Sequence, residues 1–142
     1  AASLGLAGRV SFEGHRTDLV SVLEEADFAV LPSRIEGLSN TLLECMASGL
    51  PMIASRVSGS EDLVCPGDNG WLFEAGDAIG LARCLDAAAQ LPSARRLAMG
   101  RNAREAVTIH ADLAHVLDRL LWVYRGKTVP ANAAIPLARR SV

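Results

Sequence analysis

The 142-residue chain has the size usual for one domain, and half of its residues are hydrophobic while only 4% are aromatic, so aliphatic side chains are expected to form the core. Its formal net charge of −2 argues against a broad nucleic-acid-binding surface, because such a surface is basic. Cys45, Cys65 and Cys84 are far apart and form no C-x-x-C pair, which disfavours a zinc site or a disulfide framework and predicts reduced thiols in a cytoplasmic protein.

Short apolar strands alternate with segments of helical periodicity along most of the chain. The first ten residues have no signal-peptide organisation and resemble the end of a helix that begins upstream, which is a first indication of truncation. No apolar run reaches the ~18 residues of a membrane-spanning helix. The predicted elements, in chain order, are a strand over residues 9–13, a helix over 17–26, a strand over 28–31, a helix over 38–48, a strand over 51–54, a helical turn over 61–64, a strand over 71–73, and helices over 77–90, 92–106 and 112–124.

Strands that are apolar throughout and joined by helices are typical of a parallel sheet with helices on both faces. We therefore predict an α/β, Rossmann-like fold. Three or four strands are fewer than the five or six of a complete doubly wound domain, so the domain is expected to be incomplete. Residues 1–125 are assigned to this domain, and residues 126–142 form a C-terminal tail with little pattern.

The segment between the second and third predicted strands carries the most chemical information. Its loop follows a strand directly, and ligands of open parallel sheets bind beyond the carboxyl ends of strands. In the helix that follows, Asn40, Thr41, Glu44 and Ser48 are spaced so that they share one narrow stripe, while the rest of the helix is apolar. Glu44 is the main charge of this stripe, and a carboxylate on an otherwise buried helix is expected to need partners.

The start of the same helix provides a second feature. Free N–H groups and the positive end of the helix dipole form an anion site, and Gly37 allows close approach of the backbone to a ligand. A diphosphate is therefore expected on the N–H groups of about Leu38 to Thr41, with Glu36 and Glu44 serving hydroxyl groups at its two ends. On these residues alone, the alternative that the two glutamates are solvated surface charges stays open.

Several ordered motifs follow one another along the chain. Two glutamates separated by seven residues stand in EGLSNTLLECMASGLPMIA, residues 36–54, and the turns SGSEDLV and GDNGWL follow at residues 58–64 and 67–72. The strand VSFEG, residues 10–14, precedes them all. Over about residues 1–125, the chain resembles the C-terminal domain of retaining glycosyltransferases with the GT-B fold, family 4, also called glycosyl transferases group 1.

This resemblance implies a role for each residue of the segment. In such enzymes the first glutamate contacts hydroxyls of the donor sugar, which makes Glu36 the candidate catalytic residue. The second, here Glu44, contacts the ribose, and main-chain N–H groups between the two hold the diphosphate of a UDP- or GDP-sugar. The donor-binding residues implied in this way are Glu36, Gly37, Leu38, Ser39, Asn40, Thr41 and Glu44.

The resemblance also implies a reaction. A hexosyl group is transferred to an acceptor with retention at the anomeric carbon, usually without a bound metal or other cofactor, in polysaccharide, glycolipid or glycoconjugate synthesis. The basic pair that neutralises the leaving diphosphate and the whole N-terminal acceptor domain would lie upstream of residue 1, so the isolated chain is expected to be inactive. The full enzyme is expected in the cytoplasm, with peripheral association at the inner membrane face as an option.

Departures from the family pattern are few. Cys45 replaces a common alanine and Ser58 a common glycine, and neither changes the charged pair. Two other functions stay open. The first is a nucleotide-sugar 2-epimerase of the same fold, which would have its own acid–base residues. The second is a non-catalytic module that binds nucleotide sugars.

Overall fold

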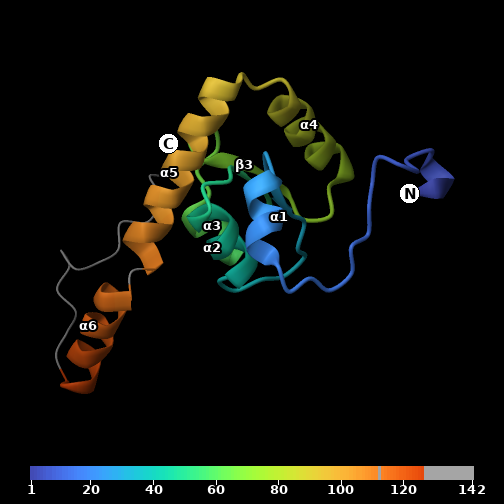
Figure 1. The fold of residues 1–142 in the computed structure, drawn as a ribbon. Helices are drawn as coiled ribbons and strands as arrows, with labels where there is room; N and C mark the ends of the chain where they lie inside the picture. Colours follow the sequence, from blue (N-terminus) through green and yellow to red (C-terminus); the bar gives the residue numbers. More distant parts are fainter. Residues whose placement is uncertain (112, 127–142) are drawn as a thin grey trace.

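The computed structural model describes residues 1–111 and 113–126, and the central part of the chain forms a small parallel sheet with helices packed against it (Figure 1). The predicted tail therefore lies outside the described residues, apart from Gly126. The elements in chain order are η1 (Ala2–Leu4), α1 (Leu19–Glu25), β1 (Ala29–Leu31), α2 (Asn40–Ala47), β2 (Met52–Arg56), α3 (Ser58–Leu63), β3 (Gly70–Glu74), α4 (Ala78–Ala89), α5 (Ser93–Ala111) and α6 (Leu113–Tyr124).

The sheet has the strand order β1-β2-β3, and both neighbouring pairs are parallel. At the end of β1, Leu31 lies opposite Ala54 of β2, and Ala54 in turn lies opposite Leu72 of β3. Met52, Ile53 and Ala54 are fully buried, as expected for a central strand that is covered on both faces. The prediction of a parallel sheet is confirmed.

Helices cover both faces of the sheet, as predicted. Because successive side chains of a strand point to opposite faces, Met52 and Ala54 belong to one core with α2 and α5, whereas Ile53 belongs to a second core with Phe73 and with Ala88 of α4. In Figure 1, α4 accordingly lies across the sheet from α2 and α5.

The predicted strand over residues 9–13 is wrong. Within the described ranges this segment takes part only in an isolated bridge between Ala7 and Val10, and the side chain of Phe12 is 84% exposed. An apolar segment becomes a strand only where its backbone N–H and C=O groups meet a neighbouring strand. β1 lies at the edge of the sheet and pairs with β2 alone, so residues 9–13 add no strand beside it. The sheet described here therefore has three strands.

Helix boundaries differ from prediction by a few residues. The helix predicted from residue 38 begins at Asn40, and the helical turn predicted over residues 61–64 is α3, which begins at Ser58. The helix predicted to end near residue 106 continues to Ala111. Asp77 caps the start of α4, because its Oδ1 accepts a hydrogen bond of 3.0 Å from the N–H of Ile79.

The cysteines are free thiols, and they differ in burial. Cys45, a residue of α2, is buried in the core, whereas Cys65 and Cys84 are half-buried. Burial raises the pKa of all three thiols, and the Glu44 carboxylate raises the pKa of Cys45 further. Among the described helices, none combines the length and the apolar character that crossing a bilayer requires.

Candidate functional site

The loop between β1 and α2 lies at the carboxyl edge of the sheet and is anchored there by the end of β2. Ser55 is 1% exposed, and its single hydroxyl proton is shared between the backbone carbonyls of Leu31, at 3.3 Å, and Ser33. Sequence reasoning missed this anchor. The signal in the sequence was a hydroxyl directly after the apolar run of residues 51–54, because a hydroxyl must find a partner when it is buried.

Glu36 lies half-buried in this loop, and its carboxylate is oriented by a neighbour. The hydroxyl of Ser33 donates a hydrogen bond of 3.0 Å to Oε1 of Glu36. Since the Ser33 carbonyl accepts from Ser55, the position of the Glu36 side chain is tied to the sheet through two serines. An ionised carboxylate only accepts hydrogen bonds, so Glu36 is suited to bind hydroxyl groups of a ligand.

Gly37 is exposed, and none of the residues that the structure describes requires it to be glycine. All twelve glycines lie within the described ranges; seven have a positive φ, and at four others an added Cβ would come within 3.0 Å of another atom. Gly37 alone among them has neither a positive φ nor any atom within 4 Å of an added Cβ. The space beside its backbone is therefore open to a ligand.

The first turn of α2 presents unpaired N–H groups. Ser39 is the N-cap in extended backbone conformation, and its side chain makes no capping hydrogen bond. The intrahelical bonds begin with the N–H of Leu43, which donates to the Ser39 carbonyl at 3.1 Å. The N–H groups of Asn40 and Thr41 therefore have no acceptor within the helix, which is the arrangement that binds anions.

The predicted polar stripe of α2 is confirmed. Asn40, Thr41, Glu44 and Ser48 are exposed, whereas Leu42, Cys45 and Met46 on the opposite side are buried. Glu44 itself is exposed, so its carboxylate is solvated and the expected need for a partner does not arise. Leu38 is 61% exposed, and Ser39 is buried. The predicted site residues thus lie on one continuous segment whose open side faces solvent.

Comparison with known proteins identifies the family to which this segment belongs. The family model described as "Glycosyl transferases group 1" matches residues 1–90, which include the loop and α2. The chain belongs to the glycosyl transferases group 1 family. It is 36% identical over 116 residues to the lipopolysaccharide core biosynthesis glycosyltransferase LpsE of Rhizobium meliloti, covering 76% of this chain and 34% of that protein.

A further relative is the N-acetyl-alpha-D-glucosaminyl L-malate synthase of Bacillus anthracis. It is 38% identical over 107 residues, which are 74% of this chain and 27% of that enzyme. The chain thus spans only about a third of the length of these curated relatives.

Solved structures show the same fold. Sucrose-phosphate synthase from Thermosynechococcus elongatus superposes with a TM-score of 0.79 at 30% identity, covering 88% of this chain and 32% of that one. Anabaena HepE in complex with UDP superposes with a TM-score of 0.81 over 88% of this chain and 34% of that one, and its 24% identity makes it a comparison of fold alone. The family member described here therefore has the architecture of part of a GT-B glycosyltransferase.

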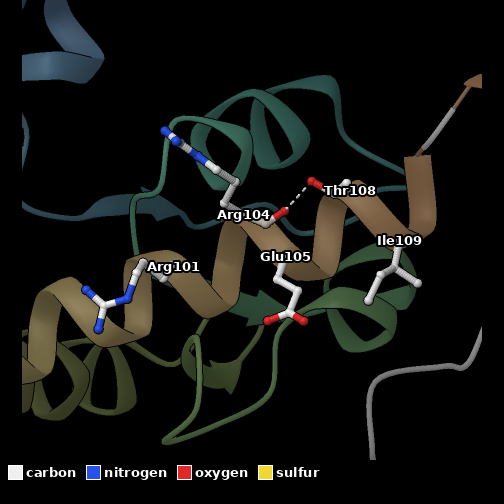
Figure 2. A pocket seen from close by; sticks show the side chains of 5 residues that line it. All are labelled: Arg101, Arg104, Glu105, Thr108 and Ile109. Carbon is white, nitrogen blue, oxygen red and sulfur yellow. Dashed lines mark hydrogen bonds between the residues drawn. The ribbon is translucent and has the colours of Figure 1, made fainter.

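Away from this segment, a hollow of about 520 Å³ lies along α5 (Figure 2). Its side chains include Arg101, Arg104 and Glu105, and the hydroxyl of Thr108 donates to the Arg104 carbonyl at 2.9 Å. Arg104 also donates from Nε to the carbonyl of Ala47, at the end of α2, over 2.8 Å. The residues of the hollow belong to a single helix, and none of them belongs to the β1–α2 loop.

Proposed function

We propose that the loop over residues 33–39 and the exposed stripe of α2 bind the nucleotide-sugar donor of a retaining family 4 glycosyltransferase, and that this chain is its C-terminal, donor-binding part. The observation that carries the proposal is Gly37, because neither its backbone conformation nor the packing of the described residues requires glycine there, and a closely bound ligand would. The unpaired N–H groups of α2 begin three residues later.

The roles follow from the order of groups along the segment. The diphosphate lies against the backbone of Gly37 to Thr41, where N–H groups and the helix dipole stabilise negative charge. Glu44, one turn further along the exposed stripe, accepts hydrogen bonds from the ribose hydroxyls of a UDP- or GDP-sugar. Glu36, held by Ser33 on the other side of the diphosphate, accepts hydrogen bonds from hydroxyls of the sugar.

Glu36 is the candidate catalytic residue because it is assigned to the reacting sugar. A contact to that sugar accelerates transfer to the extent that it strengthens as charge develops at the anomeric centre. The hexosyl group then passes to an acceptor with retention of configuration and without a bound metal or other cofactor.

The proposal places the other parts of the active site outside this chain. A preceding acceptor domain and a basic pair for the leaving diphosphate belong to the rest of the polypeptide, so the chain alone is expected to bind donor without transferring it. We place the complete enzyme in the cytoplasm, associated peripherally with the inner membrane face, and acting in polysaccharide, glycolipid or glycoconjugate synthesis.

The test compares two glutamate variants on two ligands. In Glu44→Gln, the affinity for UDP or GDP measured by calorimetry should fall by about 10- to 100-fold, since a hydrogen bond to a charged group contributes roughly 1.5–3 kcal/mol. In Glu36→Ala, the affinity for the nucleoside diphosphate should stay within about twofold, while the affinity for the nucleotide sugar falls. Glu24→Gln, an exposed glutamate on α1, removes the same charge away from the site and serves as the control.

The catalytic part of the proposal needs the two-domain protein. There, Glu36→Ala should lower the transfer rate by about 10²-fold, equivalent to roughly 2.7 kcal/mol of transition-state stabilisation. Normal turnover in this variant would remove Glu36 from catalysis. Unchanged nucleotide affinity in Glu44→Gln would remove Glu44 from the site, and a wild-type chain that binds neither UDP nor GDP would refute the donor site as a whole.

A further inference from the structure

Gly59, in the short helix α3, lies in direct contact with the loop that carries the proposed donor site. A Cβ built on Gly59 would lie 1.9 Å from the carbonyl oxygen of Gly37 and 2.9 Å from the Cα of Leu38, both far inside van der Waals contact. Gly59 has no positive φ, so its backbone conformation would accept any residue. The contact with the loop is therefore what excludes a side chain at this position.

The two sides of this contact differ in how firmly they are held. On the α3 side, Gly59 and Ser60 are buried, and Leu63 is 2% exposed in the main core. On the loop side, Gly37 is exposed and Leu38 is 61% exposed. Although Ser55 anchors the start of the loop, a group inserted at Gly59 is therefore expected to displace the exposed residues Gly37 and Leu38 rather than α3.

We propose that Gly59 is a positioning residue for the donor site, because it provides the flat surface of α3 on which the Gly37 carbonyl rests. This contact holds one side of the Gly37 peptide against α3 and leaves the other side open to the ligand. It thereby sets where the peptides that precede α2 meet a nucleoside diphosphate. The inference rests on the proposed function and adds to it a residue that does not touch the donor.

Gly100 of α5 offers a matched control at the other end of the same segment. A Cβ on Gly100 would lie 2.1 Å from the carbonyl oxygen of Gly49, two residues after the end of α2. Gly59→Ala and Gly100→Ala therefore insert the same methyl group against a backbone carbonyl, one at the loop before α2 and one at the turn after it. Both are expected to lower the unfolding temperature.

The experiment measures UDP affinity by calorimetry at a temperature where circular dichroism shows both variants folded, together with backbone amide chemical shifts. Gly59→Ala should move the amide resonances of Gly37 and Leu38 and weaken UDP binding by about 10-fold or more, the loss expected for one charge-assisted hydrogen bond. Gly100→Ala should leave those resonances in place and change the affinity by less than about threefold.

Two results would overturn the inference. One is a folded Gly59→Ala chain that binds UDP as tightly as wild type, and the other is an equal loss of affinity in both variants, which would mark a general effect of stability. If the wild-type chain binds no nucleoside diphosphate, the proposed function fails, whereas the Gly37 and Leu38 amide shifts still decide whether Gly59 positions the loop.

The wild-type chain provides the test if Gly59→Ala does not fold. A nuclear Overhauser contact between the Hα protons of Gly59 and Leu38 should be present, and the Gly59 amide should shift on addition of UDP. Absence of the contact, or an unmoved Gly59 amide at saturating UDP, would overturn the inference.

Discussion

Replacing Gly37 with alanine should separate ligand binding from stability. The added methyl group meets no atom of residues 1–111 or 113–126 within 4 Å, and Gly37 has no positive φ, so the folded structure accommodates it without strain. Alanine also restricts the unfolded chain, and such Gly→Ala changes typically stabilise a protein by about 0.4–1 kcal/mol. The free energy of unfolding of Gly37→Ala should therefore equal or slightly exceed that of wild type.

Nucleotide binding should respond in the opposite direction. The methyl group occupies the open space beside the backbone in which the diphosphate is placed, and it forces the phosphates away from the N–H groups. The loss of one hydrogen bond to a charged group, roughly 1.5–3 kcal/mol, corresponds to an affinity lower by about 10- to 100-fold. Calorimetric titration with UDP and with GDP measures this, and urea unfolding followed by circular dichroism measures stability.

Gly67→Ala is the control, because its expected effects on stability and affinity are the reverse of those of Gly37→Ala. Gly67 precedes β3 at the opposite edge of the sheet and also has open space around an added Cβ, but its φ is +80°. Gly67→Ala should therefore lose about 1–2 kcal/mol of stability, the cost of the left-handed conformation, and keep wild-type affinity for nucleotides. The reasoning is refuted if Gly37→Ala binds nucleotide normally, or if it is destabilised as Gly67→Ala is.

Three further predictions concern stability alone. The hydroxyl of Ser60 is buried without a hydrogen-bond partner among the described residues, so Ser60→Ala should raise the free energy of unfolding by about 1 kcal/mol in urea titrations, and a destabilised variant would contradict this. Burial raises the pKa of Cys45, Cys65 and Cys84, so these thiols lose their protons at lower pH in the unfolded chain than in the folded one. Stability should be independent of these groups below about pH 8 and should fall as pH rises from there toward 10, and urea midpoints that stay level across this range would argue against it. Asp77→Ala removes the cap of α4 and should cost about 1 kcal/mol, measured in the same way, whereas Asp77→Asn should retain most of the stability.

The sequence by itself determined those features that follow from local chemistry and periodicity. The apolar run Met52–Ala54 identified a strand covered on both faces, because such a strand has no side that can bear polar residues. The stripe formed by Asn40, Thr41 and Glu44 identified the exposed side of α2, because helical geometry alone brings these residues together. The same reasoning failed for residues 9–13, since no local pattern tells whether a partner strand stands beside an apolar segment.

The two glycines of the site show what only the tertiary structure decided. In the sequence, Gly37 precedes a predicted helix start and so indicates close approach of the backbone to a ligand, whereas nothing in the sequence assigns a role to Gly59. In the folded chain Gly59 packs against Gly37. The carbonyl oxygen of Gly37 occupies the position that a side chain on Gly59 would need, which is why residue 59 is glycine. The position that a side chain on Gly37 would occupy is open space. Which glycine is crowded and which is open depends on how α3 packs against a loop some twenty residues earlier, and such a contact between distant segments leaves no trace in the local pattern.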